Sequence, residues 1–262
     1  MRLDQLLNKV HCADCLTVMG QMPAACVDVI VTSPPYNIRN SSGGGLRNGS
    51  GGMWERAQLL DGYAGGFSDD MPYPDYVDWQ RECLTAMMRV LKEDGAIFYN
   101  HKWRVQDGLL QDRREIVEGF PVRQIIIWQR ARGINFNRSY FLPTYEVIYL
   151  ICRKSFRLAK SDDPKHPKKA CGIDDVWSVK QDHDYKHPAP FPVEIPRRCI
   201  AATDAKIVFD PFLGSGSTAV AAEMLGRDWI GVDNSREYCE MADQRVKECR
   251  RRNVVGEDPG RN

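Results

Sequence analysis

The sequence lacks several features that would assign it to a class at once. No apolar run is long enough to span a bilayer, which argues against a membrane protein. The N-terminal stretch MRLDQLLNKV has no apolar signal core, so we expect a protein that stays in the cytoplasm. The net charge is only +1, which neither requires nor excludes a nucleic-acid partner.

Cysteines are present, but they lack the pattern of a disulfide framework or a zinc site. Nine of them stand at irregular spacings in a chain without an export signal, which indicates reduced thiols that act as small buried hydrophobic residues. Cys12 and Cys15 form a single C-x-x-C pair, with no second pair at zinc-like spacing. The sequence therefore predicts no metal centre.

Alternating strand and helix patterns predict the fold. Strands are expected at residues 10–12, 27–31, 96–100, 122–130, 145–154, 206–210 and 229–233, and those at 122–130 and 145–154 are apolar enough to be central. Helices are expected at 15–20, capped by Asp14, and at 74–92, 219–225 and 235–251, with Asp94-Gly95 ending the second. The alternation is typical of a mostly parallel sheet with helices on both faces.

Two segments interrupt this pattern. Residues 40–66, which are rich in Gly, Ser and Asn, cannot bury enough apolar surface to fold alone. We expect residues 39–72 to form a mobile loop, either a plain surface loop or a lid beside an active site. Residues 153–187 are basic, turn-rich and weakly periodic.

The stretch VIVTSPPYNI, residues 29–38, stiffens the chain directly after a strand. Pro34 and Pro35 have no amide hydrogen to donate, and each restricts the residue before it. The hydroxyl of Ser33, rigid carbonyl groups and the ring of Tyr36 are thereby held at a strand end. The alternative interpretation is a simple strand ending with Tyr36 packed in the core.

A second stretch, DPFLGSGST at residues 210–218, joins a strand to a helix. Gly214 and Gly216 permit a tight turn and the close approach of a ligand. Ala219 replaces the third glycine of the dinucleotide fingerprint, and the lysine of a P-loop is missing. Asp233 ends the next strand, where such units hold ribose hydroxyls. These features predict a nucleoside site without a pyrophosphate; a tight turn and a helix-capping Asp are the alternative.

Together, TSPPY and DPFLGSGST resemble the paired signatures of the S-adenosylmethionine-dependent DNA methyltransferases that modify exocyclic amino groups. The SPPY element comes first and the glycine element last, with a basic segment between them, which resembles the β class of these enzymes. The similarity extends from VHCADCLTVM through LKEDGAIFYN, PTYEVIYLICRK and KHPAPFPVEIPRRCI to GVDNS. It implies one catalytic domain over residues 1–262 with a circularly permuted, Rossmann-like α/β fold, whose sheet contains one antiparallel strand.

The resemblance also implies roles for residues of both stretches. The lone pair of an exocyclic amino group is delocalised into the base ring, and Ser33 and the carbonyl of Pro34, kept in place with Pro35, would accept its two hydrogens. Tyr36 would stack on a base flipped out of the duplex. The residues implied to bind S-adenosylmethionine are Asp14, Thr32, Asp210, Phe212, Gly214, Gly216, Ser217, Thr218 and Asp233.

Double-stranded DNA is the implied partner, with residues 153–187 as a short target-recognition segment. Phosphate contacts there would give affinity without sequence information, whereas Arg and Asn side chains near residues 130–138 are types that read base edges. The short segment suggests that a homodimer holds the DNA. The candidate DNA-binding residues are Asn37, Arg39, Arg130, Arg132, Asn135, Asn137, Arg138, Lys165, Lys168 and Lys169.

The target base is the least determined feature. Ser before the two prolines is the usual pattern of cytosine N4 enzymes, whereas adenine N6 enzymes more often have Asp or Asn. The continuation PPYNI and the compact layout resemble adenine-modifying β-class members, so we favour adenine N6, with cytosine N4 as the alternative. Intact signatures argue against an inactive DNA-binding regulator, and their order argues against enzymes acting on RNA or protein glutamine.

The resemblance finally implies a cellular setting. We expect a bacterial or phage-type cytoplasmic protein associated with the nucleoid. It would act either as a stand-alone regulatory methylase or beside a cognate restriction endonuclease.

Overall fold

A computed structural model describes residues 1–37, 71–106, 109–130, 138–161, 165, 171–180 and 191–255. The predicted glycine-rich loop of residues 39–72 therefore lies outside the described residues, except for Met71 and Pro72. Much of the predicted recognition segment, 153–187, lies outside them as well.

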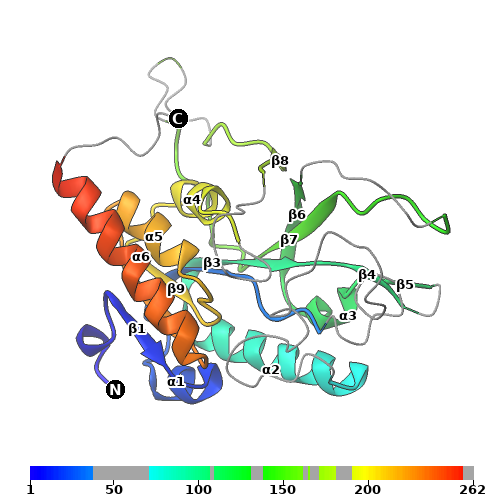
Figure 1. Cartoon of the computed structure of the whole chain (residues 1–262), viewed down its shortest axis with the longest axis horizontal. Helices are drawn as coiled ribbons and strands as arrows, with labels where there is room; N and C mark the ends of the chain where they lie inside the picture. Colours follow the sequence, from blue (N-terminus) through cyan, green and yellow to red (C-terminus); the bar gives the residue numbers. More distant parts are fainter. Residues whose placement is uncertain are drawn as a thin grey trace.

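One mixed sheet organises the described residues (Figure 1). Its strand order is β1-β10-β9-β2-β3-β7-β6-β8. The strands are β1 (Lys9–Cys12), β2 (Val27–Thr32), β3 (Leu91–His101), β6 (Val122–Gln129), β7 (Tyr145–Cys152), β8 (Val176–Ser178), β9 (Ile207–Asp210) and β10 (Asp228–Asp233). In this sheet β7 alone runs antiparallel to its neighbours, β3 and β6, while the other paired strands are parallel. The predicted sheet, mostly parallel with one antiparallel strand, is confirmed.

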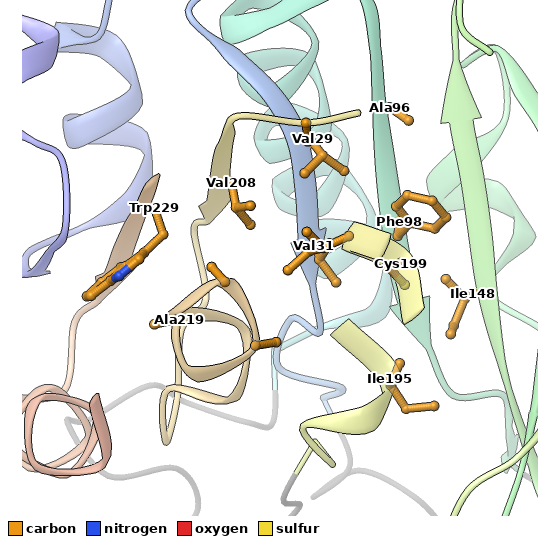
Figure 2. Close-up of a cluster of buried hydrophobic side chains, with 14 of the residues drawn as sticks. Val29, Val31, Ala96, Phe98, Ile148, Ile195, Cys199, Val208, Ala219 and Trp229 are labelled. Carbon is orange, nitrogen blue, oxygen red and sulfur yellow. The ribbon is translucent and has the colours of Figure 1, made fainter. Parts of the chain in front are cut away.

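Helices cover both faces of the sheet, as predicted. On one face lie α1 (Cys15–Gln21), α2 (Tyr73–Val90) and the short α3 (Arg114–Val117); on the other lie α4 (Glu194–Ala201), α5 (Ser217–Met224) and α6 (Arg236–Val255). The period-two alternation of a strand explains this division, because Val29 and Val31 of β2 pack on the second face while Ile30 packs on the first. Figure 2 shows Val31 beside α4, the helix that carries Cys199.

The second helix ends earlier than its sequence suggests. It stops at Val90, β3 begins at Leu91, and the predicted stop at Asp94-Gly95 lies inside the strand. The pairing of β2 with β3 shifts register between Val27 and Val29, so an irregularity accommodates these residues. A Cβ atom on Gly95 would lie 2.6 Å from the carbonyl oxygen of Asp28, which shows that glycine serves close strand packing there.

Two other features differ from the expectation. β6 is not central but lies next to the edge strand β8, and Ile125 in it is 48% exposed. A separate antiparallel hairpin forms from β4 (Arg104–Gln106) and β5 (Leu109–Gln111), each too short to give a sequence pattern. No helix in the part of the chain described above is long and apolar enough to cross a membrane.

Candidate active site

The two sequence signatures meet at one edge of the sheet. Thr32, Asp210 and Asp233 end the parallel strands β2, β9 and β10. β7 runs in the opposite direction, so its first residues reach the same edge. A pocket that is partly open to solvent lies there. Its lining includes Asp14, Ser33, Pro34, Pro35, Tyr36, Asp210, Phe212, Ser217, Thr218 and Asp233 from the predicted set.

Asp210 is the most buried acidic group of this pocket. It is 3% exposed and accepts hydrogen bonds from the Thr32 hydroxyl at 2.7 Å and the Phe212 amide at 3.0 Å. Burial raises the pKa of Asp210 to about 6, although hydrogen bonds from Thr218 and Thr32 oppose the shift. Thr32 is fully buried and lies behind the pocket wall, where it fixes this carboxylate.

Asp233 fixes the glycine turn. Its carboxylate accepts from the amide of Gly214 at 2.8 Å and from the amide of Ser235 at 2.9 Å, and burial raises its pKa. Gly214 adopts a positive φ of 52°, which favours glycine. The carboxylate of Asp233 also lines the pocket, so one residue joins the end of β10, the turn and the candidate ligand space.

Gly216 has the left-handed backbone that a tight turn requires, and it also faces a neighbouring helix. Its φ is +88°, and an added Cβ atom would lie 2.8 Å from the Cβ atom of Ala242 in α6. The space on that side is occupied by α6, so a glycine at this position allows the helix to pack closely on the turn. Arg245 of α6 completes the turn from behind, with its guanidinium donating to the carbonyl of Ser215 at 2.8 Å and to Ser217 Oγ at 3.2 Å.

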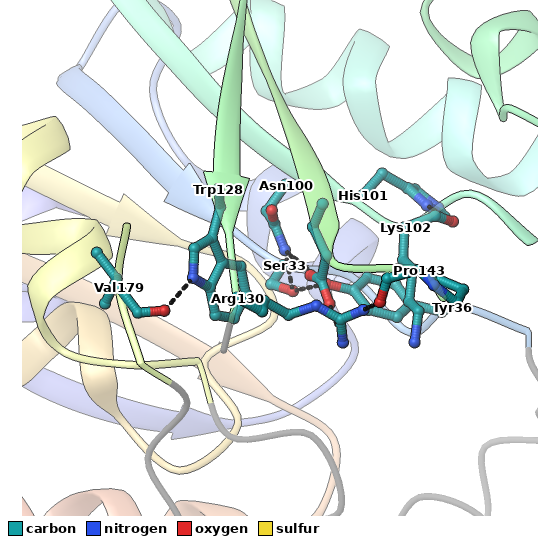
Figure 3. Close-up of polar contacts among 10 residues, drawn as sticks. Ser33, Tyr36, Asn100, His101, Lys102, Trp128, Arg130, Pro143 and Val179 are labelled. Atoms are coloured by element: carbon teal, nitrogen blue, oxygen red, sulfur yellow. Dashed lines mark hydrogen bonds and ion pairs between the residues drawn. The ribbon is translucent and has the colours of Figure 1, made fainter. Parts of the chain in front are cut away.

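The Ser-Pro-Pro-Tyr segment carries a compact hydrogen-bond network (Figure 3). Ser33 Oγ lies 2.7 Å from the Tyr36 hydroxyl, which donates to Glu146 at 3.0 Å. The Asn100 amide nitrogen lies 2.5 Å from the Tyr36 oxygen and 3.0 Å from Glu146. Asn100 comes from β3 and Glu146 from β7, so three strand ends converge on Ser33.

A second set of polar groups holds the backbone of this segment. The Tyr76 hydroxyl donates to the carbonyl of Pro35 at 2.8 Å and lies 2.7 Å from His101 Nε2. Burial lowers the pKa of His101 to about 3, with the charge of Arg113 adding to the shift, so the imidazole is neutral at physiological pH. These contacts keep the carbonyl of Pro35 in place without supplying a group that titrates near neutral pH.

Arg113 is an uncommon support for the same segment. It is 1% exposed, donates to the carbonyl of Tyr36 at 3.1 Å and lies 5.0 Å from the ring centroids of both Tyr73 and Tyr76. Arg113 also has a left-handed backbone, with φ of 65°. Its burial could not be predicted from the sequence, because arginine is a surface residue in most proteins.

Other contributors to the pocket were also missed. Trp79 of α2 lies edge-on to Phe212, with ring centroids 5.6 Å apart, and both residues line the pocket. Trp79 falls on the apolar face of the helix predicted at residues 74–92, and this position indicates core packing rather than a ligand site. The remaining lining residues outside the predicted set are Ala13, Cys15, Phe191, Pro211, Leu213, Ser215, Asn234 and Tyr238. The described residues contain no group of three His, Cys, Asp or Glu side chains that could hold a metal ion.

The predicted DNA-binding residues divide into three groups. Asn37 is fully buried and donates to the carbonyl of Met71 at 2.7 Å, so here it holds the turn after the prolines. Arg130 has a side chain only 12% exposed and forms an ion pair with Glu146 at 3.4 Å. Arg138 and Lys165 are exposed. Arg39, Arg132, Asn135, Asn137, Lys168 and Lys169 lie outside the described residues.

Comparison with known proteins agrees with this arrangement. A family model for N6/N4 methyltransferases, described as DNA methylase, matches residues 27–244. The type II methyltransferase M.BglII from Bacillus subtilis is 27% identical over 274 residues, covering 92% of this chain and 69% of that protein.

Solved structures share the fold. The cytosine-N4-specific PvuII DNA methyltransferase superposes with a TM-score of 0.65 at 18% identity, covering 95% of this chain and 93% of that one. The protein TTHA0409 from Thermus thermophilus, solved in complex with S-adenosyl-L-methionine, gives a TM-score of 0.62 at 22% identity, covering 92% of this chain and 93% of that one. The predicted circularly permuted methyltransferase fold is thereby confirmed.

Proposed function

The chain belongs to the N6/N4 DNA methylase family, and from this premise we propose that it transfers the methyl group of S-adenosylmethionine to the N6 amino group of adenine in DNA. The observation that carries the proposal is the shared pocket. Ser33 and Tyr36 of one signature line the same space as Asp210 and Asp233 of the other. A methyl donor and an amino acceptor can therefore meet between them.

The donor side of the pocket fits S-adenosylmethionine. This cofactor supplies an electrophilic methyl group on a sulfonium, and it also carries an ammonium group and a ribose. The buried carboxylate of Asp210 suits the ammonium group, and that of Asp233 suits the ribose hydroxyls. The apolar faces of Phe212 and Trp79 complete this side of the pocket. Asp14 lines the pocket as well, although its carboxylate also caps α1 by accepting from the Thr17 amide at 2.8 Å.

The acceptor side suits an exocyclic amino group. Ser33 Oγ and the carbonyl of Pro34 would each accept one of its hydrogens, which makes the nitrogen more tetrahedral and directs its lone pair toward the methyl group. Tyr76 and Arg113 hold the neighbouring carbonyls of Pro35 and Tyr36 in place. The segment is preorganised, so little rearrangement is needed when the reaction begins. Tyr36 would stack on the flipped base.

Adenine is our choice of target base because the PPYNI continuation and the compact layout resemble adenine-modifying β-class enzymes. The serine before the prolines favours cytosine N4 as the second candidate. Mass spectrometry of nucleosides from mixed-sequence DNA, incubated with protein and S-adenosylmethionine, distinguishes them. A gain of N6-methyladenine supports the proposal, and a gain of N4-methylcytosine keeps the mechanism but replaces the base.

DNA contact is proposed to lie beside this pocket. Arg138 belongs to the Arg and Asn side chains near residues 130–138, which are types that read base edges. Lys165 belongs to the basic segment 153–187. Both side chains are exposed, which suits phosphate contacts. A homodimer would supply further DNA contacts to compensate for the short recognition segment. A cognate restriction endonuclease and a place at the nucleoid belong to the same proposal.

A further inference from the structure

A buried carboxylate lies directly behind the Ser-Pro-Pro-Tyr segment. Glu146, the second residue of β7, is 4% exposed. One of its oxygens, Oε2, accepts from the Tyr36 hydroxyl and from the Asn100 amide, both at 3.0 Å. The other oxygen, Oε1, lies 3.4 Å from the Arg130 guanidinium. Both oxygens of the carboxylate are therefore engaged, and turning it would break at least one of these contacts.

The contacts of Tyr36 fix the direction of the hydrogen bonds. A phenol has one hydrogen to donate, and an ionised carboxylate can only accept. Tyr36 therefore donates to Glu146, and its oxygen must accept from Ser33 Oγ at 2.7 Å. The hydroxyl hydrogen of Ser33 is thus committed to Tyr36, in a chain that runs from Ser33 to Tyr36 to Glu146.

The position of Asn100 is consistent with this direction of the hydrogen-bond chain. Its amide nitrogen lies 2.5 Å from the Tyr36 oxygen and 3.3 Å from Ser33 Oγ, and the nitrogen is the end of the amide that can face a carboxylate. A hydroxyl oxygen has two lone pairs. Asn100 approaches one of them on Ser33, and the other remains for a ligand in the pocket that Ser33 lines.

We propose that Glu146 is a positioning residue that holds the hydroxyl of Ser33 as a hydrogen-bond acceptor for the amino group of the target base. This inference rests on the proposed function, because it concerns the same transfer step. A Ser33 hydroxyl turned the other way would donate its hydrogen to the amino nitrogen. It would then occupy the lone pair that must attack the methyl group.

Replacing Glu146 by glutamine cannot satisfy both sides of the carboxylate. If the amide oxygen faces Tyr36 and Asn100, the amide nitrogen faces the Arg130 guanidinium, and two donors oppose each other. If the amide is reversed, its nitrogen opposes the Asn100 nitrogen and donates to Tyr36. Tyr36 would then donate to Ser33, and the whole chain would change direction.

The test is a double-mutant cycle on the single-turnover rate of methyl transfer to DNA. Glu146→Gln should slow transfer by roughly 10- to 100-fold, the range for losing a hydrogen bond to a charged group, and should leave the Kd for S-adenosylmethionine within about twofold. Tyr36→Phe keeps the ring but removes the link, so it should slow transfer to a similar degree. The combined variant should be no slower than Tyr36→Phe alone, because Glu146 acts through that hydroxyl.

The matched control is Glu223→Gln. Glu223 is likewise a glutamate paired with an arginine, Arg250, but it is less buried and lies outside the pocket lining, so its replacement should leave the rate unchanged. Thermal melting of each variant confirms that the assay temperature lies below unfolding. Two results overturn this inference and leave the proposed function standing. One is a folded Glu146→Gln variant that transfers at the wild-type rate. The other is a Glu146→Gln change that slows transfer as much in the Tyr36→Phe background as it does in the wild type.

Two further results are decisive. If Glu146→Gln does not fold, Tyr36→Phe alone tests the chain, and a full transfer rate in it overturns the inference. A wild-type protein that transfers no methyl group overturns the proposed function, and this inference falls with it.

Discussion

Thr32 Oγ1 donates a hydrogen bond of 2.7 Å to Asp210 Oδ1, between the adjacent strands β2 and β9. The two residues are 178 positions apart in the sequence. Thr32 directly precedes the Ser-Pro-Pro-Tyr segment, and Asp210 begins the glycine turn. A single buried bond therefore ties the acceptor side of the pocket to its donor side.

The burial of Asp210 predicts a pH-dependent contribution to stability. Its pKa is raised from 3.8 to about 6 by burial in the folded protein. Because the folded pKa is the higher one, the stability from this group is full below 3.8 and is lost as the pH rises through about 6. Asp210→Asn keeps the acceptor for Thr32 but cannot ionise, so the cofactor-free variant should gain stability relative to wild type over this window. Urea denaturation at several pH values measures the difference, and a pH-independent difference would contradict it.

The turn at Gly216 predicts a large cost for one methyl group. Gly216→Ala places a Cβ atom against Ala242 at a φ of +88°, so we expect a loss of about 1–3 kcal/mol in the free energy of unfolding. Gly226→Ala tests the left-handed backbone alone, since φ is +62° but no atom lies within 4 Å, and should cost about 1 kcal/mol. Gly20→Ala in α1, with open space and no positive φ, should not destabilise. Equal stability of all three variants would remove the packing role of Gly216.

Asp233 should contribute to the binding of the cofactor. Asp233→Ala removes the acceptor of the Gly214 and Ser235 amides and the carboxylate proposed for the ribose. We expect the Kd for S-adenosylmethionine, measured by calorimetry, to increase by roughly tenfold or more. Asp228→Ala at the opposite end of β10 is the control and should leave the Kd unchanged. An unchanged Kd for Asp233→Ala would remove this residue from the site.

The basic segment should act through the phosphates of DNA. Replacing Lys165, Lys168 and Lys169 together by glutamine should weaken binding to all DNA sequences to a similar degree. It should also reduce the slope of log K against log salt by about 0.9 for each phosphate that is no longer neutralised. Three exposed lysines elsewhere, Lys9, Lys206 and Lys247, changed to glutamine together, control for net charge. A salt slope equal to that of wild type would place DNA on another surface.

The sequence predicts those parts of the site that follow from strand ends. Asp210 and Asp233 could be placed together because the carboxyl ends of parallel strands share an edge, and the structure brings both into one pocket. The supports could not be predicted. Asn100 and Glu146 stand at the ends of apolar strands, and their importance arises only when the antiparallel β7 brings its first residues to that edge.

Other departures have equally local causes. The close packing of α6 on Gly216 could not be predicted, because this helix follows later in the chain and the turn itself carries no sign of it. Asp94-Gly95 has the composition of a helix stop, yet close packing against the carbonyl of Asp28 keeps it in β3. Arg113 contradicts the usual exposure of arginine, and its bond to the Tyr36 carbonyl and the two tyrosine rings around it explain its burial. Long-range packing decides each of these cases.

The most direct test of the central claim is single-turnover transfer from S-adenosylmethionine with a labelled methyl group to DNA, compared for wild type and Ser33→Ala. The account predicts that wild type places the label on an exocyclic nitrogen. It also predicts that Ser33→Ala slows transfer by roughly tenfold or more, with the Kd for S-adenosylmethionine unchanged. A label on a ring carbon, or an undiminished rate in Ser33→Ala, would contradict it.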